Sequence, residues 1–89
     1  MTAVQSDAAT TRPDVLAGLA SVLEEVAGTP AARVVPEAAF EKALDVDSLT
    51  MVEVVVACEE RFDVRIPDEA LEGLRTVGDA VDFLVGAGA

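Results

Sequence analysis

The sequence predicts an all-α fold, a small four-helix bundle with three longer helices and one short helix. Three stretches carry apolar residues at the spacing of one helix face, and no stretch alternates convincingly as a half-buried strand would. With 89 residues, the chain is long enough for one small domain. We expect residues 1–10, which are small and mostly polar, to form a disordered tail, residues 11–86 to form the domain, and residues 87–89 to form a C-terminal tail.

The first helix is predicted from Thr11 to about residue 27. Thr11 and Asp14 have the spacing of a capping box, and Pro13 lies in the first turn, where its missing N–H is harmless. Gly28 and Pro30 then end the helix. The residues expected to face the core are Val15, Leu16, Leu19, Val22, Leu23 and Val26.

A long connection, residues 28–47, follows the first helix. Its apolar residues Val34, Val35 and Phe40 predict that it packs over the core and contains short helical turns. Loops of this length in a compact domain usually have a function or structure of their own.

The second helix is predicted from Ser48 to Phe62, although its valine run, residues 54–56, favours a strand when taken alone. The stretch contains no glycine or proline, is too long for a typical strand, and follows Asp47, a good N-cap residue. The residues on its core face are Met51, Val54, Val55, Cys58 and Phe62.

A second apolar stripe remains on this helix. It consists of Leu49, Val52 and Val56, flanked by Glu53, Glu59 and Glu60. Because one stripe is enough to fill a small core, we expect the second to stay partly exposed and to dock against a basic-rimmed groove of a partner. The alternative is that both stripes are buried.

The last part of the chain predicts two more helices. Residues 68–73 suffice for one or two turns. Thr76 and Asp79 repeat the capping-box spacing and open a final helix, which Gly86 and Gly88 end.

The composition excludes several functions. The chain has no histidine, and its single cysteine, Cys58, can form neither an internal disulfide nor a metal site. A net charge of −11 disfavours nucleic acid and favours partners with basic patches, although acidity that merely keeps the protein soluble is a plainer alternative. The unpaired cysteine and the lack of an apolar leader or membrane-length apolar run predict a cytoplasmic protein without membrane insertion.

Ser48 is the residue best placed to carry chemistry. At a helix N-terminus, free backbone N–H groups and the positive end of the helix dipole stabilise a phosphate ester. Without histidine a Ser-His-Asp arrangement is excluded, and Lys42, the only lysine, fits loop surface better than a catalytic base. We therefore interpret Ser48 as an acceptor that another protein modifies; the plainer alternative is a serine making a local hydrogen bond.

Ser48 also stands in an ordered series of motifs. Asp47-Ser48-Leu49 is followed by Met-Val-Glu at 51–53, Glu-Glu-Arg-Phe-Asp at 59–63, Ile-Pro-Asp-Glu at 66–69 and Thr-Val-Gly-Asp-Ala at 76–80. In this order and spacing the chain resembles the acyl carrier proteins over residues 12–86. On its alanine- and valine-rich background, the motif around Ser48 is most similar to the discrete carriers of the dissociated (type II) fatty acid synthase in GC-rich Gram-positive bacteria.

The resemblance implies a non-catalytic carrier. Ser48 would receive 4′-phosphopantetheine from coenzyme A through a separate holo-acyl-carrier-protein synthase, with Asp47 near that enzyme's metal and no metal site in the carrier itself. The arm's thiol would hold acyl chains as thioesters. We expect a monomer. The face read by the malonyl transferase, the ketoacyl synthases, the reductases and the dehydratases would comprise Leu49, Val52, Glu53, Val56, Glu59 and Glu60.

Two positions depart from the family pattern. Many carriers have a glycine where this chain has Asp45, so the loop before Ser48 is expected to differ. Cys58 stands where a larger aliphatic residue is common, and we interpret it as a small buried hydrophobe and not a reactive thiol. Small core residues around it could part to admit an acyl chain, with ordinary core filling as the plainer alternative; these are Val54, Val55, Ala57 and Cys58.

Two other functions stay open at this point. One is a carrier dedicated to polyketides or another secondary metabolite, since the same motif and helix face serve both pathways. The other is an unmodified acidic module that binds a basic partner and carries no cargo. A peptidyl carrier is disfavoured, because such carriers commonly have two glycines where Asp45 and Val46 stand.

Overall fold

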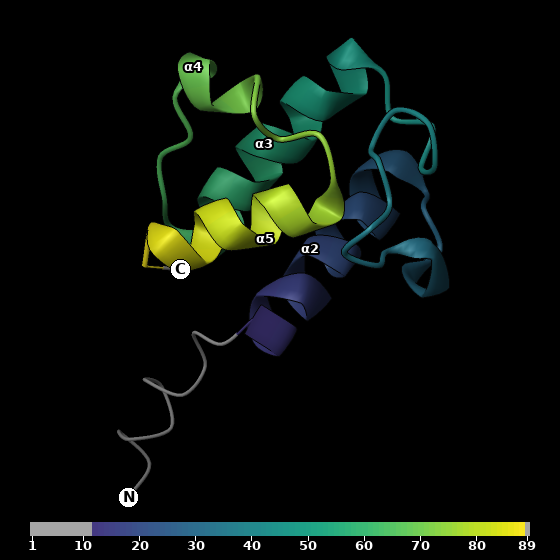
Figure 1. Cartoon of the computed structure of the whole chain (residues 1–89), viewed down its shortest axis with the longest axis horizontal. Helices are drawn as coiled ribbons and strands as arrows, with labels where there is room; N and C mark the ends of the chain where they lie inside the picture. Colours follow the sequence, from purple (N-terminus) through teal and green to yellow (C-terminus); the bar gives the residue numbers. More distant parts are fainter. Residues whose placement is uncertain (1–11, 89) are drawn as a thin grey trace, which may run out of the picture.

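The computed structural model describes residues 12–88, which form helices and no strand (Figure 1). The all-α prediction, with three longer helices and one short one, is confirmed for this part of the chain. The predicted tail at 1–10 and Thr11 of the first capping box lie outside it, and the domain boundaries at 11–86 and 87–89 stay predictions. The elements are α2 (Arg12–Ala27), the 3-10 helix η1 (Ala31–Arg33), α3 (Ser48–Phe62), α4 (Asp68–Leu71) and α5 (Val77–Gly86).

Helix α2 packs against both α3 and α5 (Figure 1). Gly18 permits the close approach to α3, because a Cβ atom there would lie 2.7 Å from Cζ of Phe62. The helix ends at Ala27, and Gly28 follows with a φ of +72°. The Gly28 N–H donates to the Glu24 carbonyl, as in an αL cap, and the Thr29 N–H donates to the Leu23 carbonyl.

The core lies between these three helices and the connection of residues 28–47. Burying a valine or leucine side chain stabilises the fold by roughly 1.5–3 kcal/mol. Tertiary burial of Val54 and Val55 therefore outweighs the strand preference of the valine run in α3, whose third valine, Val56, stays exposed. The buried apolar residues are Val15, Leu19, Val22, Leu23, Val34, Ala38, Phe40, Leu44, Val46, Val54, Val55, Cys58, Ile66, Val77, Ala80, Val81 and Leu84.

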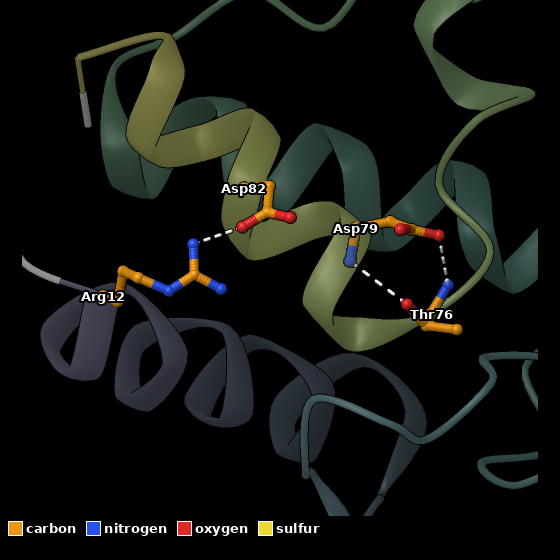
Figure 2. Close-up of polar contacts among 4 residues, drawn as sticks. All are labelled: Arg12, Thr76, Asp79 and Asp82. Atoms are coloured by element: carbon orange, nitrogen blue, oxygen red, sulfur yellow. Dashed lines mark hydrogen bonds and ion pairs between the residues drawn. The ribbon is translucent and has the colours of Figure 1, made fainter.

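Helix α5 begins with the predicted capping box (Figure 2). The Thr76 Oγ1 accepts a hydrogen bond from the Asp79 N–H, and the Asp79 Oδ2 accepts one from the Thr76 N–H, both at 3.1 Å. The guanidinium of Arg12 pairs with Asp82 and links the start of α2 to α5 (Figure 2), but both side chains are exposed, so the pair adds little stability. Gly86 still belongs to α5, so the helix runs slightly further than predicted.

The connection of residues 28–47 packs over the core through Val34 and Phe40, as predicted, whereas Val35, the third expected anchor, is exposed. Its Phe40 N–H donates to the Arg75 carbonyl at 3.0 Å, and the Val77 N–H donates to the Ala38 carbonyl at 2.9 Å. These bonds flank an isolated antiparallel bridge between Ala39 and Thr76. The segment before α3 is thereby fixed to the segment before α5. Within residues 12–88, every helix is too short or too polar to cross a lipid bilayer.

Candidate functional site

Ser48 is the first residue of α3 and is exposed to solvent. Asp47 precedes it in an extended conformation and caps the helix, since its Oδ1 accepts a hydrogen bond from the Thr50 N–H at 2.8 Å. This bond lowers the pKa of Asp47, so its carboxylate is ionised at neutral pH. Leu49 is also exposed, at 72%. The three residues of the motif are thus accessible to a modifying enzyme.

The loop before Ser48 has a left-handed residue, Asp45, with a φ of +59°. Its neighbours Leu44 and Val46 point into the core, and the Val46 N–H donates to the Phe40 carbonyl at 2.8 Å. A left-handed conformation is strained for most L-residues, and aspartate is one of those that tolerate it. Glycine, which many carriers have at this position, adopts this φ without strain. Because aspartate tolerates the same φ, the turn is kept in this chain.

An open groove of about 620 Å³ lies beside Ser48, which is one of its lining residues. Three separate segments line it: residues 39–42, residues 46–51 and residues 71–75. Its lining is apolar in part and carries four charged side chains. The lining residues are Ala39, Phe40, Glu41, Lys42, Val46, Asp47, Ser48, Met51, Leu71, Leu74 and Arg75.

A small apolar void of about 10 Å³ lies deeper between the helices. This is roughly the room that one water-sized probe occupies. Three residues, Phe40, Met51 and Leu74, line both the void and the groove and so separate them. Of the four residues predicted to part for an acyl chain, Val54, Val55 and Cys58 line the void and Ala57 does not.

Cys58 is buried, as predicted, with 3% of its surface exposed. Burial raises the pKa of its thiol to about 12, because the thiolate would lose its hydration. At neutral pH the side chain is therefore a neutral, apolar group in the core, and its thiolate is not available as a nucleophile.

The second stripe of α3 is exposed. Val52 and Val56 are 52% and 48% exposed, and Glu53 and Glu60 beside them are exposed as well. Glu59 is half-buried, and its Oε2 accepts a hydrogen bond from the Ile66 N–H at 2.8 Å. This contact, which the sequence did not reveal, fastens the loop after α3. The docking role of the stripe stays a prediction.

Comparison with known proteins adds to this geometry. Residues 17–84 match the family described as "Phosphopantetheine attachment site". The acyl carrier protein of Acidothermus cellulolyticus is 56% identical over 79 residues, which cover 89% of this chain and 94% of that protein. The chain belongs to the acyl carrier protein family.

Two further relatives are similar over most of their length. The meromycolate extension acyl carrier protein of Mycolicibacterium smegmatis is 50% identical over 85% of this chain and 77% of its own. The acyl carrier protein of Thermobifida fusca is 48% identical over 80% of this chain and 90% of its own. The predicted acyl carrier role in fatty acid synthesis, the 4′-phosphopantetheine cofactor and the similarity to carriers of GC-rich Gram-positive bacteria are confirmed.

The residues around Ser48 fit this cofactor. The hydroxyl is exposed at the first turn of a long helix, where backbone N–H groups lack helical acceptors and the dipole is positive. A groove opens beside it. Both features accommodate an anionic phosphodiester with a long organic arm.

Proposed function

We propose that Ser48 is the attachment site of the 4′-phosphopantetheine arm and that the chain delivers acyl groups to the enzymes of fatty acid biosynthesis without catalysing a reaction itself. The observation that carries the proposal is the position of Ser48, an exposed serine at the first turn of α3 within the segment that matches the phosphopantetheine attachment family. When attached, the group supplies a terminal thiol that holds acyl chains as thioesters.

The residues next to Ser48 prepare it for modification. Asp47 holds the first turn of α3 through the Thr50 N–H, which keeps the Ser48 hydroxyl on a fixed helix end. Its ionised carboxylate stands beside the site of transfer and is a suitable group to lie near the divalent metal of the holo-acyl-carrier-protein synthase. The carrier itself needs no metal for this role.

The exposed stripe of α3 is the proposed docking face for the synthase, the malonyl transferase, the ketoacyl synthases, the reductases and the dehydratases. Its apolar centre, Leu49, Val52 and Val56, provides a small contact area, and Glu53 and Glu60 complement basic patches. A small, charged interface suits a carrier that must bind many enzymes briefly. We propose that it does so as a monomer in the cytoplasm.

We further propose that the void beside Cys58 widens to shelter an acyl chain. Phe40, Met51 and Leu74 separate the void from the groove at Ser48, so small movements of these side chains would join the two spaces. An apolar chain gains about 0.8 kcal/mol for each CH₂ group that it buries, which favours such a movement as the chain grows.

Intact-mass measurement tests the attachment site. The apo protein is incubated with coenzyme A and a holo-acyl-carrier-protein synthase, alongside Ser48→Ala and the control Ser21→Ala, which changes a half-buried serine on α2. We expect the phosphopantetheine mass increment in the wild type and in Ser21→Ala, and none in Ser48→Ala. An equal increment in Ser48→Ala, or no increment in the wild type, would refute the proposal.

The cargo on the arm provides a second test. Mass spectrometry of the protein purified from its native cells should find acyl groups of fatty acid elongation on the arm. Polyketide intermediates, or a protein without the arm, would contradict the proposal.

A further inference from the structure

The groove beside Ser48 has a different charge balance from the rest of the chain. The chain has seventeen acidic and six basic residues, a net charge of −11. The groove is lined by two acidic residues, Glu41 and Asp47, and two basic residues, Lys42 and Arg75, so its formal charge is zero. A third of all the basic side chains therefore gather at one groove of a strongly acidic protein.

Neither basic side chain has a carboxylate partner in the part of the chain that the structure describes. Within residues 12–88 the ion pair is that of Arg12 with Asp82, and no hydrogen bond of the Lys42 ammonium or the Arg75 guanidinium is found there. Both residues are exposed at the rim of the groove. Their positive charge is thus available to a ligand.

Backbone hydrogen bonds hold the segments that carry the two cations next to each other. The Arg75 carbonyl accepts the Phe40 N–H at 3.0 Å, and the Arg75 N–H donates to Asp79 Oδ2 at 3.2 Å. Lys42 follows Phe40 by two residues, in a turn closed by the hydrogen bond from the Ala43 N–H to the Ala39 carbonyl at 2.9 Å. The segments that carry the two cations are therefore tied together before any ligand arrives.

We propose that Lys42 and Arg75 form an anion-binding pair for the phosphodiester of the arm on Ser48. This inference rests on the attachment site proposed above. The phosphodiester is an anion placed beside the ionised carboxylate of Asp47, and the two cations would add to the helix N-terminus in offsetting that repulsion. Arg75 offers a planar fork of N–H donors and Lys42 a compact charge, and both types of side chain bind phosphate oxygens well.

Phosphorus NMR of the holo protein tests the pair. The measurements are the ³¹P transverse relaxation rate of the phosphodiester and the Nε–H signal of Arg75. The test variant is Lys42→Gln with Arg75→Gln. The control is Arg61→Gln with Arg65→Gln, which removes the same charge from exposed residues outside the groove. Intact mass confirms loading of every sample, and circular dichroism confirms its helicity.

We expect fast ³¹P transverse relaxation in the wild type and the control, because the bound phosphodiester moves little relative to the protein. In the test variant the phosphodiester should move freely, and its ³¹P relaxation should be slower. The Arg75 Nε–H signal should shift between the apo and holo wild type. Because the Debye length falls to about 3 Å at 1 M salt, high salt should reproduce the effect of the test variant in the wild type.

Two results would overturn the pair. One is the same ³¹P relaxation in wild type and test variant, and the other is an equal change in the control, which would show a general effect of charge. If the test variant takes up little phosphopantetheine, the wild-type salt series tests the pair in its place, and ³¹P relaxation that does not change with salt would overturn it. A wild type that takes up no phosphopantetheine would refute the attachment site itself, whereas a loaded wild type with a freely moving phosphodiester would refute only the pair.

Discussion

The buried thiol of Cys58 is expected to make the apo protein lose stability above pH 9. Burial raises the pKa of this thiol from 9.0 to about 12, so the folded protein keeps a proton that the unfolded chain releases. The contribution of the protonated thiol to the free energy of unfolding is fully present below pH 9 and is lost as the pH rises towards 12. One pH unit corresponds to about 1.36 kcal/mol, which gives a loss of roughly 3 kcal/mol at pH 11. For a domain of this size the melting temperature should then fall by roughly 10–20 °C.

The composition of the chain favours a measurement of stability against pH. The chain has no tyrosine and a single lysine, so changes in stability between pH 9 and 12 report mainly on the thiol. The control is Cys58→Ala, which removes the thiol and retains the lysine. We expect this variant to be about 1 kcal/mol less stable than the wild type at pH 8, because it loses buried packing. The two stabilities should cross near pH 10.

Denaturant unfolding followed by circular dichroism from pH 8 to pH 11 measures both curves. Parallel curves for the wild type and Cys58→Ala would refute the reasoning, since the thiol would then titrate equally in the folded and unfolded states.

The remaining predictions concern exposed and capping residues. Replacing Glu53 and Glu60 by lysine should weaken association with partner enzymes by roughly tenfold at low salt and reduce its salt dependence, while the helicity stays nearly unchanged. Thr76→Val should lower the free energy of unfolding by about 1 kcal/mol, measured by denaturant unfolding, because α5 loses its cap. Asp45→Gly should raise the free energy of unfolding by about 0.5 kcal/mol in the same assay, because glycine adopts the positive φ more easily.

Each of these changes has a matched control. Lysine at Glu24 and Glu25, exposed on α2, should leave enzyme association almost unchanged, and an equal loss there would reject the docking face. Thr76→Ser retains the capping oxygen and should be nearly neutral; a loss as large as that of valine would contradict the capping role. Asp68→Gly places glycine in α4, where φ is helical, and should destabilise; stabilisation there would contradict the reasoning for Asp45.

The helices could be predicted because their signals are local. Asp47 caps α3, and Thr76 with Asp79 caps α5, through residues three positions apart in the sequence, a spacing that can be read without the fold. The exposure of Val52 and Val56 followed from counting apolar stripes on one helix. The strand propensity of the valine run would by itself have predicted a strand in place of α3. The run is helical because two of its side chains are buried in the core.

The groove beside Ser48 could not be predicted, because it depends on tertiary contacts. Lys42 and Arg75 are far apart in the sequence and come together through the bond between the Phe40 N–H and the Arg75 carbonyl. The hydrogen bond of Glu59 to the Ile66 N–H is equally invisible in the sequence, where Glu59 looks like its exposed neighbours. One indication of the turn at Asp45 was present in the sequence, because many carriers have a glycine at this position.

The most direct test of the attachment site is fragmentation mass spectrometry of the native protein after trypsin digestion. Cleavage after Lys42 and Arg61 releases a peptide of residues 43–61, which contains two hydroxyl residues, Ser48 and Thr50. We predict phosphopantetheine on Ser48 of this peptide. Its presence on Thr50, or on any peptide outside residues 43–61, would contradict the account.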